Sequence, residues 1–265
     1  MRFNINKKTY AKWLQHAIQH EKPKPLINNN QTYSVGIISD LHIGSIWDQP
    51  AKVKEFSDYC LQQGIETLVC CGDIAEGKYY HRSGHEHEVY IDSADGIIER
   101  VIEVYPAGFE RSLLIGGNHD TTLWQRAGIN IVKAVTKERT DLTYVGDSAG
   151  GFVTLPGGID AYLYHGSGGC SETRTTRTQR LARFVQSLGS KCSKRPQALF
   201  VGHCHSVSIL PKFLDMLVVG CGSFQMMTSY EGEHIAKVPD ICGMIVRYNV
   251  VKGRMLDIST ELKFY

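Results

Sequence analysis

The stretch Leu113-Leu-Ile-Gly-Gly-Asn-His-Asp120 decides the fold, because it joins an apolar strand to a polar ending. Its first three residues predict a short buried strand, and two glycines, an amide, an imidazole and a carboxylate follow in succession. Taken alone, the ending is a weak signal, since Gly-Asn commonly opens turns and a single histidine beside an aspartate is usually a surface or capping pair. Its meaning depends on whether other strands end in the same way.

Length and composition describe a folded globular chain. Its 265 residues can bury a large core, and its content of 42% hydrophobic and 21% charged residues excludes a disordered protein. No apolar run approaches the roughly 20 residues needed to cross a bilayer, and the start of the chain lacks the apolar core of a secretory signal. The eight cysteines lack a disulfide-framework spacing. We therefore expect a soluble, cytoplasmic protein with no membrane partner. The net charge of +2 gives no overall argument for binding nucleic acid.

The order of the expected elements indicates an arm followed by one α/β domain. Residues 9–20 carry an amphipathic helical pattern and a polar linker follows, so we expect an arm over residues 1–31 and the main domain over 32–265. The arm helix could pack on the domain or bind a partner. Strands are expected at 33–39, 67–71, 112–115, 142–145, 152–155, 161–164, 198–201, 216–219, 243–250 and 255–264.

Helices are expected at 50–63, 88–105, 121–137 and 176–189. The first half of the domain therefore reads as β-α-β-α-β, which favours a parallel sheet covered by helices. The second half is richer in short adjacent strands and favours an antiparallel or mixed sheet.

Five of the apolar strands end in a residue that can bind a metal ion, namely Asp40, Asp73, Asn118, His165 and His203. Ligands of α/β proteins gather beyond the carboxyl ends of the strands, so these side chains would converge on one cleft. His42 and His205 each follow a candidate ligand by two positions, a spacing that puts both side chains on one face of an extended chain, with Cys204 facing away as a packing residue. Each of these short motifs, taken alone, is usually a coincidence. Because candidate ligands recur at the ends of five strands, however, together they predict a shared metal site.

The complete, ordered set of motifs resembles the signature of the calcineurin-like metallophosphoesterases. It spans residues 33–225 and comprises Asp40-Leu-His42, Gly72-Asp73, Gly117-Asn-His-Asp120, His165-Gly166 and Gly202-His-Cys-His205. The resemblance implies an α/β fold: a two-sheet β-sandwich flanked by helices on both outer faces, with two metal ions at the C-terminal edge of the strands. It implies that one metal takes Asp40, His42, Asp73 and His205, and that the other takes Asp73, Asn118, His165 and His203, with Asp73 bridging.

The types of ligand independently suit divalent ions. Imidazole, carboxylate and amide oxygen without thiolate favour Mn²⁺, with Fe or Zn²⁺ as alternatives. Two such ions clamp a phosphoryl group and supply a bridging hydroxide for in-line attack. His119 lies next to a ligand but outside the ligand set, and it resembles the general acid of the family. We therefore expect a dinuclear metal-dependent phosphoester hydrolase.

Two carboxylates are expected to support this chemistry. Asp120 would orient a ligand or the loop backbone. Glu76 occupies the place where the phosphoprotein phosphatase branch has an aspartate that supports the general acid. That branch follows with an arginine, where this chain has Gly77, and it ends its third motif in glutamate, where this chain has Asp120. Both departures argue against a protein phosphatase, and residues 38–45 instead resemble Mre11-type nucleases and archaeal DNA polymerase small subunits.

Two loops are candidates for setting specificity. Residues 78–88 follow Asp73 directly, and His81 and Arg82 could contact substrate there, although a solvated polar loop is the more ordinary reading. Residues 167–195 carry seven arginines and lysines against one glutamate, and Arg174 and Arg177 are the expected phosphate contacts. Such contacts would hold nucleic acid in a salt-dependent manner. The expected substrate is thus a phosphodiester in nucleic acid or a nucleotide.

Other functions stay open at this point. Some retromer and polymerase subunits that resemble the family are non-catalytic platforms, but they usually lose a ligand or the general acid, whereas this chain keeps all seven ligand positions and His119. A phosphomonoesterase or protein phosphatase is a further alternative. The sequence does not distinguish Mn²⁺ from Fe or Zn²⁺, or a monomer from an oligomer.

Overall fold

The computed structural model describes residues 31–78, 84–91, 93–169, 174–235 and 237–265. All but the last residue of the expected arm lies outside the described residues, as do His81 and Arg82, so the predictions for them stay predictions. Among the described residues, no helix combines the length and apolarity that crossing a bilayer requires.

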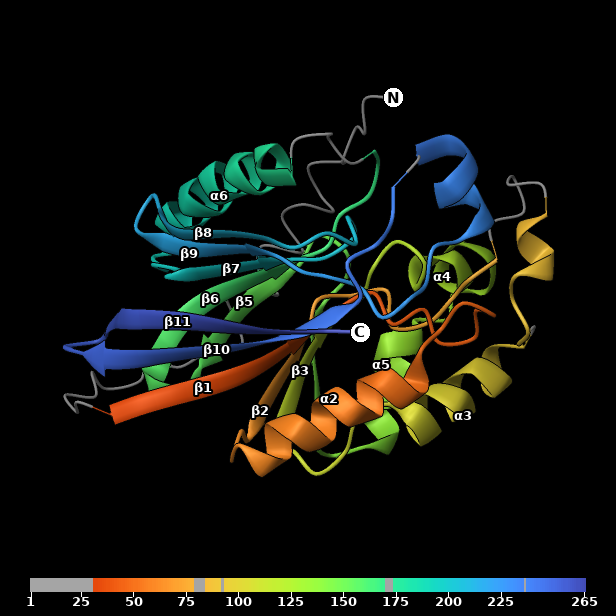
Figure 1. Ribbon diagram of the computed structural model, residues 1–265, viewed down its shortest axis with the longest axis horizontal. Coiled ribbons are helices and arrows are strands. Elements are labelled where there is room, and N and C mark those ends of the chain that lie inside the picture. The colour runs from red at the N-terminus through yellow and green to blue at the C-terminus, as the bar shows by residue number, and fades with distance from the viewer. Residues whose placement is uncertain (1–30, 79–83, 92, 170–173, 236) are drawn as a thin grey trace.

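Two mixed β-sheets form the centre of the molecule (Figure 1). The first has the order β11-β10-β1-β2-β3-β4, in which β1 to β4 run parallel and the β10–β11 hairpin pairs antiparallel with β1. Its strands are β1 (Gln31–Ile38), β2 (Thr67–Cys70), β3 (Arg111–Ile115), β4 (Leu142–Gly146), β10 (Cys242–Val251) and β11 (Arg254–Phe264).

The second sheet has the order β5-β6-β7-β9-β8, with a parallel centre and an antiparallel strand at each edge. Its strands are β5 (Gly151–Leu155), β6 (Ile159–Tyr164), β7 (Ala198–Val201), β8 (Ser208–Phe213) and β9 (Met216–Gly220). Both sheets are therefore mixed. The parallel arrangement expected for the first half of the domain is confirmed for β1 to β4, and the antiparallel strands of the first sheet come from the end of the chain.

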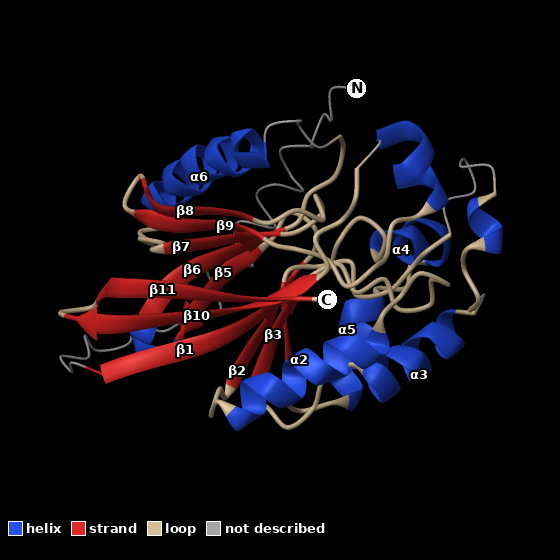
Figure 2. Ribbon diagram, viewed as in Figure 1, coloured by secondary structure: helices blue, strands red, loops and turns tan. Residues whose placement is uncertain are grey.

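Helices cover the outer face of each sheet (Figure 2). The first sheet carries α2 (Pro50–Gln62), α3 (Ala94–Val104) and α5 (Ile131–Glu138), and the second carries α6 (Arg174–Lys191). The short helix α4 (Thr121–Ala127) lies beside α5. Two single-turn 3₁₀ segments (His85–His87 and Pro156–Gly158) and a π-helical turn (Glu231–Ile235) complete the described elements.

Three buried clusters fill the spaces between these four layers. Alternation along the strands creates them, because successive side chains of a strand point to opposite faces of its sheet. On β2, Leu68 packs under the helices while Val69 packs between the sheets. On β7, Phe200 packs between the sheets while Leu199 packs under α6. The helix-sheet-sheet-helix arrangement confirms the expected two-sheet sandwich flanked by helices.

Two expected helices differ in their extent, and one strand was not expected. The helix expected at 88–105 begins only at Ala94, because Ser93 caps it by accepting a hydrogen bond from the amide of Gly96. The helix expected at 121–137 is two helices, since Gly128 ends α4 in the left-handed conformation and Asn130 caps α5. Strand β8 was missed because it is an edge strand in which only Ser208 is buried and which contains a proline.

Candidate metal centre

The seven candidate ligands lie at one edge of the molecule, where five parallel strands from the two sheets end. Asp40 and His42 follow β1, Asp73 follows β2 and Asn118 follows β3. In the second sheet, His165 follows β6, and His203 and His205 follow β7. The loops beyond these strand ends gather on the same side in Figure 2. The topology thus brings together segments separated by more than 160 positions in the chain, such as those of Asp40 and His205.

The backbone at this edge is unusual. Asp40, His42, Asp73, His203 and His205 all have positive φ angles, between 46° and 78°. Non-glycine residues adopt this conformation rarely, and such strain concentrates at functional sites. The expectation that Asp40 and His42 share a face of an extended chain is therefore wrong, because the backbone at these two residues is left-handed and not extended. The two side chains meet because the left-handed turns after β1 aim them at the same point.

The first group of converging side chains contains Asp40, His42 and His205. The Nε2 atoms of the two histidines lie 3.2 Å apart, and Nε2 of His205 lies 3.2 Å from Oδ1 of Asp40. Asp40 is fully buried, and its carboxylate accepts hydrogen bonds from the hydroxyl of Ser39 and the backbone amide of His203. One carboxylate and two imidazoles thus face a common point.

The second group contains Asp73, His165, His203 and Asn118. Nε2 of His165 lies 2.9 Å from Oδ2 of Asp73 and 3.1 Å from Oδ1 of Asn118. Nδ1 of His203 lies 2.7 Å from the same Asn118 oxygen. Oδ2 of Asp73 also lies 3.8 Å from Nε2 of His42, so this carboxylate stands between the two groups.

A glycine makes room for that carboxylate. A Cβ on Gly117 would meet Oδ1 of Asp73 at 2.0 Å, which no side chain could tolerate. The amide of His119, two residues on, donates a hydrogen bond of 2.7 Å to the same oxygen. Gly117 therefore lets the backbone after β3 wrap around Asp73.

The donor set fits divalent cations. Nδ1 of His42 faces Glu76 at 2.7 Å and Nδ1 of His205 faces Glu231 at 2.9 Å, so each outer nitrogen carries the hydrogen because a carboxylate can only accept. In the neutral form of each histidine, the inner nitrogen would then present a lone pair toward the other histidine and toward Asp40. His165 faces acceptors on both sides, the carbonyl of Cys71 and the carboxylate of Asp73. Such a surplus of acceptor atoms suits cations, with outer partners fixing each imidazole as in metal sites.

The same surplus of acceptor atoms shifts the pKa values of the buried side chains at the site. Burial by itself lowers the pKa of His165, but the neighbouring carboxylates of Asp73 and Asp40 raise it to about 9. Burial also opposes protonation of His205, whereas Asp40 and Glu231 raise its pKa to about 10. Burial raises the pKa of Asp40, yet the charges of His165 and His205 lower it to about 2. Without metal ions, His165 and His205 therefore bind protons. These protons would have to leave when a metal ion binds, because metal ligands must be deprotonated.

His119 lies at the rim of this cluster and is joined to it through Glu76. Its Nδ1 makes a short hydrogen bond to Oε1 of Glu76, whose other oxygen, Oε2, is the partner of His42. His85 lies 3.3 Å from Oε1, and the side-chain amide of Gln225 donates to Oε2 over 3.2 Å. Burial raises the pKa of Glu76, but the histidines His119 and His42 bring it well below its usual value. One buried carboxylate therefore connects the candidate general acid to a candidate ligand.

Asp120 braces the loops and does not face a candidate ligand. Its two oxygens accept hydrogen bonds from the backbone amides of Gly117, Ile74 and Ala75, over 2.7, 3.2 and 2.8 Å. Burial, followed by the charge of Asp73, raises its pKa to about 6. Of the two alternatives that the sequence left open, the structure shows contact with the loop backbone.

Several residues at this edge were not expected from the sequence. Gln225 and Glu231 reach Glu76 and His205 from the loop after β9, where no strand ending or paired spacing could have indicated them. His85 lies in the loop 78–88 that the sequence indicated for substrate contact, and the structure places it against Glu76 in a 3₁₀ turn. Lys237 also donates a short hydrogen bond to the carbonyl of Cys204.

The expected substrate contacts have protein partners of their own. Arg174 forms a 2.5 Å ion pair with Asp240. Arg177 is largely buried and donates a 3.1 Å hydrogen bond to the carbonyl of His165, and this burial lowers its pKa. Both arginines thus lie near the loops of His165 and His205, and their role toward substrate stays a prediction.

Cys204, expected only to pack, is disulfide-bonded, whereas the other cysteines of the described residues are free.

The chain is similar to known proteins in sequence or in fold. Residues 33–238 match the family model described as the calcineurin-like phosphoesterase superfamily domain. No curated protein sequence matches the chain. Similar solved structures include a conserved protein described as a predicted phosphoesterase from Streptococcus pneumoniae, with 11% identity, coverage of 89% of this chain and 99% of that chain, and a TM-score of 0.40. Vps29 from Chaetomium thermophilum has 14% identity, coverage of 88% and 96%, and a TM-score of 0.41. The family model covers well over half of the chain, and the chain therefore belongs to the calcineurin-like phosphoesterase superfamily.

Proposed function

We propose that the protein is a dinuclear metal-dependent phosphodiesterase that acts on nucleic acid or nucleotides. The observation that carries the proposal is the chain of contacts from His119 through Glu76 to His42, beside two groups of converging donors. A non-catalytic platform needs no histidine at the rim whose ring is held by a buried carboxylate. A hydrolase needs one, because the leaving oxygen must receive a proton.

The two donor groups would hold two divalent ions. Asp40, His42 and His205 would bind one ion, Asn118, His165 and His203 the other, and Asp73 would bridge them. When bound, such ions polarise a phosphoryl group and lower the pKa of water, so that a nucleophile exists at neutral pH. Imidazole, carboxylate and amide ligands without thiolate suit Mn²⁺, Fe or Zn²⁺, and we propose Mn²⁺ as the first ion to test.

The protein side chains would direct the rest of the reaction. Oxygen from water adds to phosphorus, the P–O bond to the leaving group breaks, and the leaving oxygen takes a proton from His119. Because Nδ1 of His119 is engaged by Glu76, that proton would come from Nε2. A protonated imidazole at this position would also attract the substrate phosphate. Asp120 would keep the loops of Asp73 and Asn118 in register.

The preference for a diester in nucleic acid or a nucleotide comes from the surroundings of the site. Arg174 and Arg177 lie on the first turn of α6, and Arg177 contacts the backbone of His165 itself. We propose that they contribute positive charge to substrate binding. The departures at Gly77 and Asp120 from the protein phosphatase pattern argue against a protein phosphatase.

A substrate panel tests the proposal. Hydrolysis of bis- and mono-p-nitrophenyl phosphate and of single- and double-stranded DNA and RNA is measured with Mn²⁺, Fe²⁺ or Zn²⁺. We expect metal-dependent diester hydrolysis that Asp73→Asn abolishes, while the surface variant Asp215→Asn retains it. No turnover on any substrate with any metal would favour a non-catalytic platform, and a preference for the monoester would favour a phosphomonoesterase.

A further inference from the structure

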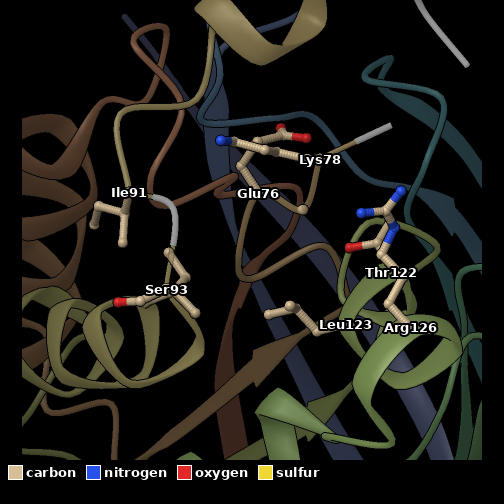
Figure 3. A pocket seen from close by; sticks show the side chains of 9 residues that line it. Glu76, Lys78, Ile91, Ser93, Thr122, Leu123 and Arg126 are labelled. Carbon is tan, nitrogen blue, oxygen red and sulfur yellow. The ribbon is translucent and has the colours of Figure 1, made fainter. Parts of the chain in front are cut away.

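A pocket adjoins the candidate general acid. It has a volume of about 170 Å³, and it is lined by Glu76, Gly77, Lys78, Ile91, Ser93, Ile97, Thr122, Leu123 and Arg126. In Figure 3, Ile91 and Ser93 stand on one side, the side chains of α4 stand on the other, and Glu76 and Lys78 lie across the top of the view. Its volume is below the roughly 300–1,000 Å³ typical of a whole ligand site, so it suits one unit of a larger substrate.

Two of the residues that line the pocket also hold His119. Glu76 binds the ring of His119, and the hydroxyl of Thr122 donates a 2.9 Å hydrogen bond to its carbonyl. Gly77 lies so close to α4 that a Cβ there would meet Oγ1 of Thr122 at 1.6 Å. The pocket is therefore fixed in position relative to the imidazole. Since a general acid protonates the leaving oxygen, the leaving group must lie on the side of His119.

The chemistry of the lining suggests what the pocket accepts. Ile91, Ile97 and Leu123 give it an apolar floor, and the hydroxyls of Ser93 and Thr122 stand beside that floor. Lys78 and Arg126 add two cations, while the one carboxylate, Glu76, is already surrounded by histidines and an amide. A flat apolar body with polar edges and an attached anion matches this combination. A nucleoside that carries a phosphate has these features, whereas a lipid chain would outgrow the volume.

We propose that this pocket is the leaving-group subsite and takes a nucleoside whose further phosphate lies against Lys78 and Arg126. The inference rests on the proposed function, because a leaving group exists only if a phosphodiester is cleaved. It assigns the leaving side of the substrate to the space between α3 and α4, away from Arg174 and Arg177 of α6. Specificity for an extended nucleotide then depends on Arg126 and not only on the metal site.

Dinucleotides with and without a terminal phosphate on the leaving nucleoside, in both strand directions, provide the test. The measured quantity is kcat/KM for the dinucleotide with the terminal phosphate, divided by kcat/KM for the same dinucleotide without it. We expect Arg126→Ala to lower this ratio about three- to tenfold. A change of this size lies between the loss of an exposed ion pair and the loss of a hydrogen bond to a charged group. Arg126→Lys should retain most of it. The matched control Arg254→Ala removes an exposed arginine at the opposite end of the first sheet and should leave the ratio unchanged.

A binding measurement separates the subsite from the proposed function. Calorimetric titration with thymidine monophosphate needs no turnover, and we expect Arg126→Ala and Leu123→Ala to weaken binding while Arg254→Ala does not. If no substrate is hydrolysed but nucleotide binding depends on Arg126, the proposed function fails and a nucleotide site at this pocket stands. If hydrolysis proceeds while neither the ratio nor the binding responds to Arg126→Ala, or Arg254→Ala has an equal effect, the subsite is refuted.

Discussion

Replacing His119 by asparagine should remove the general acid without removing the metal site. The side-chain amide of asparagine can occupy the place of Nδ1 and donate to Glu76, but it has no second nitrogen that carries a transferable proton. Glu76 keeps its contacts to His42 and Gln225, at 2.7 and 3.2 Å. We therefore expect the free energy of unfolding to change by less than about 1 kcal/mol. His119→Ala would leave Glu76 without that donor and cost about 1–3 kcal/mol.

The loss of rate should depend on the leaving group. General acid catalysis typically contributes about 10²- to 10⁴-fold, equivalent to about 3–5 kcal/mol of activation free energy. A nitrophenolate is a stable anion and needs little help, whereas a sugar alkoxide needs a proton. We expect His119→Asn to lower kcat about 10²- to 10⁴-fold on dinucleotides and less than about tenfold on bis(p-nitrophenyl) phosphate.

Metal content and thermal unfolding, measured on the same preparations, complete this assay. The control is His87→Asn, since His87 is an exposed histidine of the neighbouring 3₁₀ turn and should behave as wild type. Equal losses on both substrates would refute the role of His119 as general acid. Loss of bound metal in His119→Asn would show that His119 supports the centre itself.

Three further predictions concern the surroundings of the site. Glu231→Gln should weaken metal binding about 10- to 100-fold in a chelator competition, because it removes the carboxylate partner of His205, while Glu233→Gln on the same turn should not. Gly77→Ala should lower the free energy of unfolding by about 1–3 kcal/mol in denaturant titrations, since its Cβ would overlap Thr122, whereas at Gly169 an added Cβ meets nothing within 4 Å. Metal affinity should rise with pH and fall in acid, because protons compete for His165 and His205, whose metal-free pKa values are about 9 and about 10. Proton release in calorimetry checks this sign, and an affinity independent of pH between 6 and 9 would contradict it.

The sequence predicted the strand ends well because each carries two signals at once. A run such as residues 113–115 must be apolar to lie between layers, and the polar residues that follow mark the edge where parallel strands end. The positions of Asp40, Asp73, Asn118, His165 and His203 were therefore recoverable without coordinates. The left-handed backbone of Asp40 and His42 was not recoverable, because neither position is a glycine that would indicate the turn.

What the sequence missed depends on tertiary contacts alone. Gln225 and Glu231 contribute to the site from a loop after β9, about 150 positions from the Glu76 that Gln225 contacts. No spacing rule relates such residues. The pocket beside His119 is similarly invisible, because its floor combines Ile91, Ile97 and Leu123 from three separate segments. The split between α4 and α5, by contrast, was readable in Gly128 and Asn130.

The most direct test of the central claim is the number of divalent ions bound per chain, measured together with diester hydrolysis. Purified protein is loaded with Mn²⁺, freed of excess ion, and analysed by elemental mass spectrometry in wild type and Asp73→Asn. We predict two ions per wild-type chain, fewer than two in Asp73→Asn, and turnover of bis(p-nitrophenyl) phosphate only in the wild type. One ion or none in a fully folded wild-type protein, or equal metal content and activity in Asp73→Asn, would contradict a dinuclear centre bridged by Asp73.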